Sequence, residues 1–468
     1  MASVGAVIIM AAGKGTRMKS ATPKVRHAVC GLPMILYPVL SAHGAGAERV
    51  VVVTGPDDKL GDLLPDGIEV AVQSEARGTG DAVKAAAESV GEASQVLVLS
   101  GDVPLIDVDF IEKLAAHQTE SAAAMVVATA RLADPSGYGR VVRAADGGVE
   151  RIVETKVAGD ATDAELAIDE INAGIYAFDR AKLFDALDQV GADNAQGEYY
   201  LPDVLTILRA AGETVSAFDI GSPEYMLGVN SKVDLAAVTA AMNARIIRDH
   251  QLTGVTVIDP GSTWIESTVK ISPDAVIEPG SYLRGDSSIG SNAVIGPQST
   301  LTDSVVHDGA TVIHSYLVEC EVGPSASVGP FAYLRPGAKL AEGSKAGTFV
   351  EIKNSNIGAG AKVPHLSYIG DADVGEGSNL GAATITANYD GKNKHRTEIG
   401  AGVRTGVDTT LVAPVSVGDG AYTGAGSVIT KDVPADALAV ARSRQKVIED
   451  YAKRDCAKRK RDGSNHDA

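Results

Sequence analysis

The chain has 468 residues and a formal net charge of −18, from 42 lysines and arginines against 60 aspartates and glutamates. This length provides for more than one hydrophobic core, so we expect two or more domains. The acidic balance argues against a nucleic-acid-binding protein, which would carry a broad basic surface, and favours small-molecule partners.

Cysteine usage and the first apolar run indicate the compartment. Cys30, Cys320 and Cys456 are widely separated and form no CxxC pair, which predicts reducing surroundings and no structural metal. The apolar run VGAVIIMAA is too short to cross a bilayer and has no basic segment before it. We therefore expect a cytoplasmic protein that binds neither nucleic acid nor membrane.

The first part of the chain alternates between two kinds of segment. The runs 5–10, 49–55 and 95–102 are continuously apolar and end near glycines or an aspartate, as in parallel strands buried on both faces. Segment 80–90 has the composition of a helix, with an aspartate in its first turn. This order predicts a Rossmann-like α/β domain with a mostly parallel sheet, whose ligands gather at the carboxyl ends of the strands.

A glycine turn, GKGTRM at 13–18, follows the first predicted strand. It is not a Walker A loop, because Lys14 lies between the two glycines, and it lacks the third glycine of a dinucleotide fingerprint. Its backbone N–H groups can approach a phosphate, while Arg17 and the downstream Lys24 can bind phosphate oxygens. A lone GxG turn with solvated basic residues is the plainer alternative.

The stretch AAGKGTRM…PK resembles the signature of sugar-1-phosphate nucleotidyltransferases. Seven further motifs extend the similarity: QSEARGTGDAV, SGDVPL, GYGRVVR, IVETK, EINAGIY, GEYYLPD and GVNSK. Together they resemble the bacterial bifunctional N-acetylglucosamine-1-phosphate uridyltransferase/glucosamine-1-phosphate acetyltransferases, the UDP-N-acetylglucosamine pyrophosphorylase family. The resemblance extends to about Arg442 and implies a nucleotidyltransferase domain over residues 1–230.

The resemblance implies that this domain transfers uridylyl from UTP to N-acetylglucosamine 1-phosphate with Mg²⁺, the catalytic cations being Arg17 and Lys24. Asp102 and Asn230 would hold the metal through hard oxygen ligands. The implied nucleotide-binding residues are Ala11, Ala12, Gly13, Lys24, Gln73, Gly78, Thr79 and Gly101, and the implied sugar-phosphate-binding residues are Gly139, Glu154, Asn172 and Asn230.

Three points in this domain stay open. Taken singly, Asp102 is equally well a helix N-cap and Asn230 a turn residue. Ser100 stands where the family often has Tyr or Leu, and we expect altered packing there rather than lost catalysis. Gln73 and Gly78 frame a base without proving uracil.

Residues 231–252 predict a helical arm, because the segment has no glycine or proline. Ser231 is suited to cap its N-terminus, with Asp234 close by. Six apolar residues stand at helical spacing and predict the packed face: Val233, Ala236, Ala237, Ala240, Ala244 and Ile247.

From residue 253 the sequence changes to a hexapeptide repeat rich in Gly, Ser, Thr and aliphatic residues. Aliphatic residues recur at every sixth position from Ile265 to Leu301, and later phases run through Val306, Val312 and Val318 and beyond. Each unit supplies one short strand with an inward aliphatic, and three units close one coil of a solenoid. Periodicity leaves the hand of the coil open. The resemblance implies a left-handed parallel β-helix over 253–440, and families of this kind usually form homotrimers with active sites between subunits.

The repeat breaks at ANYDGKNKHRTE, residues 387–398. Such an insertion predicts a loop extruded on the binding face, although tolerated surface loops are also common. Three motifs resemble the acetyltransferase half of the family: YLRPG, EIKNS and VPHLSYIGDADVGEGSNLGA. A sugar amine that attacks the thioester of acetyl-CoA needs a base with a pKa near neutrality, and the implied base is His365.

The resemblance implies two further groups of residues in this domain. The sugar-phosphate-binding residues would be Arg335, Lys353, Tyr368 and Asn379, and the acetyl-CoA-binding residues Asn388, Tyr389, Lys394, Val407, Ala425 and Arg442. Val407 stands where the family commonly has Ser, which puts one hydroxyl contact in doubt. The basic tail, 441–468, is suited to coenzyme A phosphates of a neighbouring subunit or to solvated disorder.

Three interpretations remain. The first is the bifunctional enzyme, which makes UDP-N-acetylglucosamine for envelope polymers. The second is a nucleotidyltransferase for another base or sugar, with a β-helix that serves only assembly or regulation. The third treats the solenoid as a trimerisation scaffold alone. The motif around His365 and the loop 388–394 favour the first, because a passive solenoid needs neither.

Overall fold

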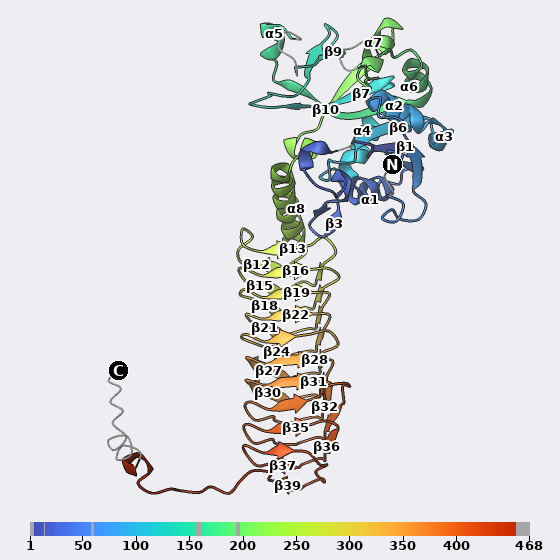
Figure 1. Ribbon diagram of the computed structural model, residues 1–468. Helices are drawn as coiled ribbons and strands as arrows, with labels where there is room; N and C mark the ends of the chain where they lie inside the picture. The colour runs from blue at the N-terminus through green and yellow to red at the C-terminus, as the bar shows by residue number, and fades with distance from the viewer. Residues whose placement is uncertain (1–3, 14, 58–59, 156–160, 193–196, 455–468) are drawn as a thin grey trace, which may run out of the picture. The chain divides into compact units, whose positions relative to one another are not determined.

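The computed structural model describes residues 4–13, 15–57, 60–155, 161–192 and 197–454. The chain forms two compact units, coloured blue to green and yellow to red in Figure 1. The first takes in the described residues up to Leu252 together with Trp264–Val269, and the second takes in Thr253–Thr263 and the described residues from Lys270 onward. No helix among the described residues is both long enough and apolar enough to span a membrane.

The first unit is built on one mixed sheet with the strand order β11-β7-β10-β6-β1-β4-β5. Strand β1 is parallel to β4 and β6, while β10 is antiparallel to both of its neighbours. The mostly parallel α/β sheet predicted from the sequence is thus confirmed. The strands are β1 (Ala6–Met10), β4 (Arg49–Thr54), β5 (Glu69–Val72), β6 (Gln95–Ser100), β7 (Met125–Arg131), β10 (Glu170–Asp179) and β11 (Val215–Asp219). Strand β8 (Arg140–Arg143) also pairs with β10, and β9 (Val149–Val153) pairs with β8.

Helices cover both faces of this sheet and bury its aliphatic side chains in two separate cores. Helices α1 (Leu36–Gly44) and α4 (Val108–Ser121) pack on one face. Helices α2 (Thr79–Ala85), α6 (Arg180–Leu187) and α7 (Asp203–Ala210) pack on the other. The helix predicted over 80–90 is divided, because Ala86 donates to the carbonyl three residues back and α3 (Ala87–Val90) begins after it.

Helix α8 (Lys232–Leu252) has the predicted N-terminal cap. The Ser231 hydroxyl accepts from the Asp234 N–H at 3.2 Å, and the Asp234 carboxylate accepts from the Ser231 N–H at 2.9 Å. The hydrogen bond from the N–H of Asn230, followed by those from Ser231 to the carboxylate, lowers the pKa of Asp234. Each side chain therefore accepts a hydrogen bond from the backbone N–H of the other residue, at the start of the helix where N–H groups have no partner within the helix.

The predicted packed face of α8 was wrong except at Ile247. Val233 is 78% exposed, whereas Val238 and Met242 are buried against Met18, Val29 and other residues of the first unit. The four predicted alanines, Ala236, Ala237, Ala240 and Ala244, lie on one side of the helix and are exposed. The large side chains decide which face packs.

The second unit is a solenoid of parallel strands two to four residues long, stacked in three sheets (Figure 1). The first sheet runs from β12 (Thr256–Val257) to β30 (Lys362–His365). The second includes β25 (Tyr333–Leu334), β28 (Glu351–Lys353) and β31 (Tyr368–Gly370), and the third includes β29 (Asn356–Ile357) and β32 (Ala372–Val374). This is the parallel β-helix of hexapeptide repeats predicted from the sequence.

The inward aliphatic ladder follows the predicted phase with one exception. The side chains of Ile277, Leu283, Ile295 and Leu301 all point inward and are fully buried. In β22 (Tyr316–Val318), however, Leu317 points inward, because it pairs with Leu301 on one side and Leu334 on the other. The prediction of Val318 as the inward residue was therefore wrong by one position, since this coil is one residue shorter there.

Candidate active sites

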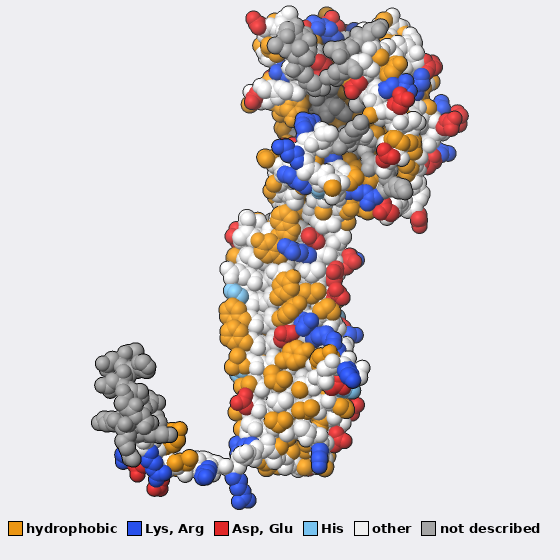
Figure 2. Space-filling model, viewed as in Figure 1, with side chains coloured by type: hydrophobic (Ala, Val, Ile, Leu, Met, Phe, Trp, Pro, Cys, Tyr) orange, Lys and Arg blue, Asp and Glu red, His pale blue; other side chains and the backbone are white. Residues whose placement is uncertain are grey.

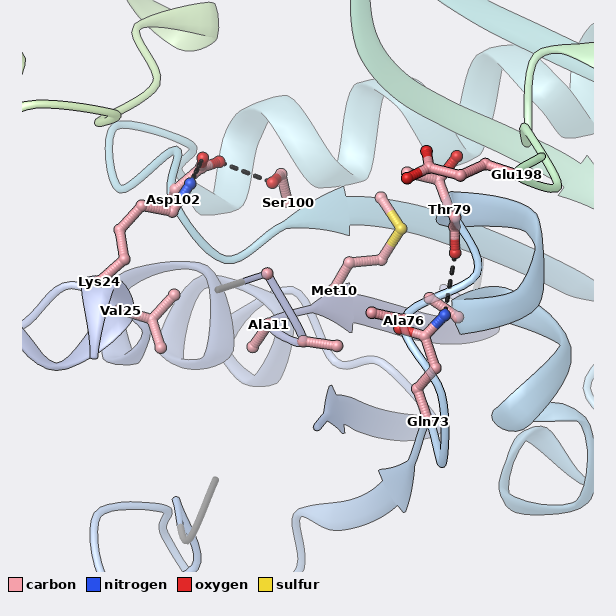
Figure 3. A pocket seen from close by; sticks show the side chains of 14 residues that line it. Met10, Ala11, Lys24, Val25, Gln73, Ala76, Thr79, Ser100, Asp102 and Glu198 are labelled. Carbon is pink, nitrogen blue, oxygen red and sulfur yellow. Dashed lines mark hydrogen bonds and ion pairs between the residues drawn. The ribbon is translucent and has the colours of Figure 1, made fainter. Parts of the chain in front are cut away.

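A cavity of about 480 Å³ opens in the first unit where β1 and β6 end (Figure 3). This is the carboxyl edge of the sheet, where the sequence predicted a ligand. Eight of the predicted residues line it: Ala11, Ala12, Gly13, Lys24, Gln73, Gly78, Thr79 and Asp102. Gly101 does not line it. A Cβ at Gly101 would lie 2.7 Å from Ile35 Cδ1, so this glycine serves packing at the end of β6.

Two motifs far apart in the sequence form one wall of the cavity. The N–H of Gly80 donates to the carbonyl of Tyr199 at 2.8 Å, and the N–H of Leu201 donates to Thr79 Oγ1 at 3.0 Å. Gly78 has φ 108° and approaches so closely that an added Cβ would lie 2.5 Å from the Tyr199 carbonyl oxygen. The segment 198–201 thus fixes the start of α2, and it carries Glu198 into the cavity lining.

Gln73 is buried behind this wall with both of its amide hydrogens engaged. Its Nε2 donates to Asp81 Oδ2 at 2.9 Å and to the carbonyl of Gly78 at 3.0 Å. The side-chain orientation of Gln73 is therefore set before any ligand binds. This arrangement holds the residues predicted to frame the nucleotide base in one fixed geometry.

Cations and oxygen ligands converge at one end of the cavity. Lys24 Nζ donates to Asp102 Oδ2 and, at 3.4 Å, to Asn230 Oδ1. Arg17 Nη2 donates to the same Asn230 oxygen at 2.9 Å. The structure thus brings together all four residues predicted to act on phosphates and metal. Lys14, in the same turn, lies outside the described residues.

Ser100 contacts Asp102, and this contact was not predicted from the sequence. Its hydroxyl donates to Asp102 Oδ1 at 2.6 Å, as the dashed line in Figure 3 marks. Since Lys24 contacts the other carboxylate oxygen, the Asp102 side chain is held from both sides. The expected consequence of Ser100 was altered packing, whereas the structure gives it a hydrogen bond to the predicted metal ligand.

Asp102 and Asn230 suit a divalent cation. Their side-chain oxygens already face a positive charge, the Lys24 ammonium, and a carboxylate with an amide oxygen is a donor set that hard cations accept. Among the described residues there is no group of three or more histidine, cysteine, aspartate or glutamate side chains arranged to hold a metal. A cation at Asp102 and Asn230 would therefore complete its shell with phosphate oxygens and water.

The three residues predicted to hold the sugar lie close together: Gly139 directly before β8, Glu154 directly after β9 and Asn172 on β10. The N–H of Asn172 donates to the Gly139 carbonyl at 2.9 Å, and Glu154 Oε1 lies 3.6 Å from where a Gly139 Cβ would be. Asn172 Nδ2 donates at 2.8 Å to Tyr176, whose pKa is raised by burial. The three residues form a group beside the cavity, not in its lining.

In the second unit, cations gather along the second sheet. Arg335 Nη1 donates to Glu351 at 2.8 Å. Lys353 lies close to Lys394 of the extruded loop, and this neighbouring ammonium is the main cause of the lowered pKa of Lys353, followed by burial. Two cations held this close predict an anionic ligand between them.

His365 ends β30 and is exposed, and the corner residue Leu366 separates it from Tyr368 at the start of β31. Within the described residues no side chain hydrogen-bonds to the His365 imidazole. Asn379 pairs with Lys362, at the opposite end of β30 from His365. Within a single subunit, Asn379 therefore lies along a different sheet from Tyr368, Arg335 and Lys353.

The extruded loop and the last coils hold the remaining predicted residues. Tyr389 pairs with Lys394 across the loop, and the Asn388 side chain is buried at its base. Arg442 Nη1 donates to the carbonyl of Ala425 at 2.9 Å. The N–H of Gly426 donates to the carbonyl of Val407, so Val407, Ala425 and Arg442 form one cluster.

The basic tail predicted over 441–468 is described only as far as Arg454, and this part is exposed. Its remaining basic residues and Cys456 lie outside the described residues.

Besides Ser100, sequence reasoning gave no role to Glu198 or Asp371, although both stand inside motifs that carried the family resemblance. Those motifs were the available signal for both residues.

Comparisons with known proteins agree with both units. Residues 7–199 match the MobA-like NTP transferase domain, and residues 268–303 match the bacterial transferase hexapeptide (six repeats). Proteins named Bifunctional protein GlmU are similar over almost the whole chain. The protein from Mycolicibacterium vanbaalenii is 49% identical over 460 residues, which is 96% of this chain and 93% of that protein. Those from Mycobacterium bovis and Streptomyces coelicolor are 47% and 48% identical over 96% of this chain, and cover 92% and 94% of their own lengths.

The contact between Gly78 and Tyr199 predicts the effect of Gly78→Ala. The new Cβ would lie 2.5 Å from a backbone oxygen, which cannot move without displacing the cavity wall. We expect the affinity for UTP, measured by calorimetry with Mg²⁺ present, to fall about tenfold or more, roughly 1.4 kcal/mol. Gly212→Ala is the control, because Gly212 has φ 80° and nothing within 4 Å of the added Cβ. Unchanged UTP affinity in Gly78→Ala would contradict the role of this contact.

Proposed function

Since the chain belongs to the bifunctional GlmU family, we propose that it catalyses two reactions, one in each unit. The second unit acetylates glucosamine 1-phosphate with acetyl-CoA. The first transfers uridylyl from UTP to the resulting N-acetylglucosamine 1-phosphate, giving UDP-N-acetylglucosamine and pyrophosphate. The observation that carries this proposal is that one chain, similar to its relatives over 96% of its length, holds a separate cluster of cationic side chains in each unit. Both co-substrates are cytoplasmic metabolites, and we place the protein there.

In the first unit the sugar phosphate attacks the α-phosphorus of UTP and pyrophosphate leaves. Arg17 and Lys24 stand where they can bind phosphate oxygens and stabilise charge in the transition state. Mg²⁺ at Asp102 and Asn230 supplies further charge neutralisation when bound. Gly139, Glu154 and Asn172 are assigned to the sugar, whose oxygen has to lie in line with the leaving group.

In the second unit the amine of glucosamine 1-phosphate attacks the acetyl carbonyl. A C–N bond forms, the C–S bond of the thioester breaks, and His365 accepts the proton from nitrogen. Coenzyme A leaves as the thiolate and takes up that proton from His365 to become the thiol. Arg335 and Lys353 are assigned to the phosphate, which matches the pair of cations near Lys394. The residues Asn388, Tyr389, Lys394, Val407, Ala425 and Arg442 are assigned to acetyl-CoA, Tyr368 and Asn379 to the sugar.

We further propose that the second unit acts as a homotrimer. Three residues at one corner of successive coils form an apolar column, made up of Phe331, Phe349 and Leu366, which are 51% to 60% exposed. On the coil before, the His314 ring lies 4.5 Å from that of Phe331, next to the exposed Ile313. The rings of Phe331 and Phe349 stack at 5.4 Å, and Figure 2 shows hydrophobic side chains along the solenoid surface. A solvated surface of this kind favours burial against another copy.

The column also adjoins the catalytic histidine, since Leu366 directly follows His365. A second copy packed against the column would bring its own residues to His365, which has no side-chain partner among the described residues of its own chain. It would also explain how Asn379, on a different sheet from Tyr368, contributes to the same site. Assembly would then complete the acetyl-transfer site.

His365→Ala tests the acetyl-transfer assignment. We expect release of free thiol from acetyl-CoA with glucosamine 1-phosphate to fall by a factor on the order of 10² or more, because the amine loses its base. Pyrophosphate release from UTP and N-acetylglucosamine 1-phosphate should remain. His307→Ala, which removes a solenoid histidine paired with Glu321 at 2.9 Å, is the matched control. If the wild type releases no thiol yet still forms pyrophosphate, the chain is a monofunctional nucleotidyltransferase on a structural β-helix.

Asp102→Ala tests the metal assignment. Uridylyl transfer should fall about a hundredfold or more while acetyl transfer is retained, because only the first unit loses an oxygen ligand. Titration with Mn²⁺ in the presence of UTP, followed by electron paramagnetic resonance, should show weakened binding. Asp109→Ala, on the exposed face of α4 and paired with Lys113, should behave as wild type. Full uridylyl activity in Asp102→Ala would remove this residue from the site.

The double variant Phe331→Glu/Phe349→Glu tests the trimer. Two buried charges at the column would oppose association, so sedimentation velocity should show dissociation. Acetyl transfer should then be lost while uridylyl transfer persists. Tyr282→Glu/Val305→Glu places the same charges on exposed apolar residues outside the column, at 40% and 36% exposure. A trimeric Phe331→Glu/Phe349→Glu variant would exclude the column as the interface.

A further inference from the structure

We infer that Asp371 is a positioning residue of the acetyl-transfer site, which ties the sugar-phosphate side of that site to the extruded loop. The inference rests on the proposed function and extends it to a residue that carried no assigned role. Asp371 stands at the corner between β31 and β32, with φ 50°, and is only 7% exposed.

Both carboxylate oxygens of Asp371 are engaged by side chains from other coils. Asn354 Nδ2 donates to Oδ1 at 2.6 Å, and Asn388 Nδ2 donates to Oδ2 at 2.5 Å. Lys353 Nζ lies 3.8 Å from Oδ2. One buried carboxylate therefore contacts Lys353, assigned to the sugar phosphate, and Asn388, the first residue of the loop assigned to acetyl-CoA.

The charge of Asp371 has a separate role. Lys353 and Lys394 repel each other, and Asp371 is the carboxylate that faces them both, with the Arg335 guanidinium also near. Burial opposes ionisation of Asp371, but the hydrogen bonds from Asn354 and Asn388 and the two ammonium groups outweigh it and lower its pKa. The carboxylate is thus charged at neutral pH and offsets the repulsion of the lysines until a phosphate arrives.

The neighbouring strand residue Asp373 holds the opposite end of the loop. Arg396 Nη2 donates to Asp373 Oδ1 at 2.5 Å, while the N–H of His395 closes onto the carbonyl of Asn388 at 2.8 Å. The tip needs neither aspartate, because Asp390 accepts from the N–H groups of Lys392 and Asn393. Asp371 is accordingly the tether that joins this loop to Lys353.

Asp371→Asn tests the inference with little change of shape. Asparagine tolerates the left-handed conformation, but its amide nitrogen would replace one of the two oxygens that accept from Asn354 and Asn388. One of these two donors would then face another donor, and the new side chain carries no charge. We expect the KM for glucosamine 1-phosphate to rise about tenfold or more, with a smaller fall in kcat. Uridylyl transfer and the thermal unfolding midpoint should match those of the wild type.

Asp303→Asn is the matched control. Asp303 occupies the equivalent corner of an earlier coil with φ 48°, and its carboxylate accepts from a backbone group, the N–H of Asp286 at 2.9 Å. Its substitution should leave both activities unchanged. This comparison separates the function of Asp371 from a general need for aspartate at such corners.

Limited trypsin digestion of the native protein gives a readout independent of activity. The loop contains Lys392, Lys394 and Arg396 as cleavage sites. We expect faster cleavage there in Asp371→Asn than in wild type or Asp303→Asn, because the loop has lost its tether. A wild-type KM together with a wild-type digestion pattern would overturn the inference. If the wild type itself releases no thiol, the proposed function fails instead, and the digestion still decides whether Asp371 holds the loop.

Discussion

The structure depends on one electrostatic constraint: cationic side chains have to be assembled in partly buried clusters within a strongly acidic chain. In the first unit Asp102 and Asn230 hold Lys24 and Arg17. In the second, Glu351 holds Arg335 and Asp371 lies beside Lys353. The carboxylates thus offset part of the positive charge in each cluster, which limits the cost of keeping charged groups partly buried. In the proposed reactions a phosphate competes with a partner already in place.

The two units meet this constraint with different scaffolds. In the α/β unit the strands β1 and β6 deliver residues to one edge of the sheet, and irregular segments after each strand supply the functional side chains. The solenoid repeats the same strand and corner in every coil, so regular positions differ little from one another. Lys353, His365 and Tyr368, to which we assign roles, accordingly stand at the ends of strands next to corners, and Asn388 and Lys394 stand in the insertion.

Much of this organisation is readable from the sequence, because glycine turns, apolar runs and the six-residue period each have a local physical cause. The failures share a different origin. Tyr316, Leu317 and Val318 are three adjacent apolar residues, and only pairing with Leu301 and Leu334 selects the inward one. Asp371 gains its partners from residues 17 positions away on either side. A single coil closes over that distance, and no local pattern marks the contact.

The wall formed by Gly78 and Tyr199 has a consequence for how such chains vary. What excludes a side chain at Gly78 is the backbone of Tyr199, and the hydrogen bonds that join the two segments also run through that backbone. The side chain of Tyr199 instead packs on the sheet core. Substitution at 199 is therefore limited only by packing, whereas glycine at 78 is retained as long as the turn exists. The residue types at these two contacting positions therefore vary independently, and only position 78 is restricted to glycine.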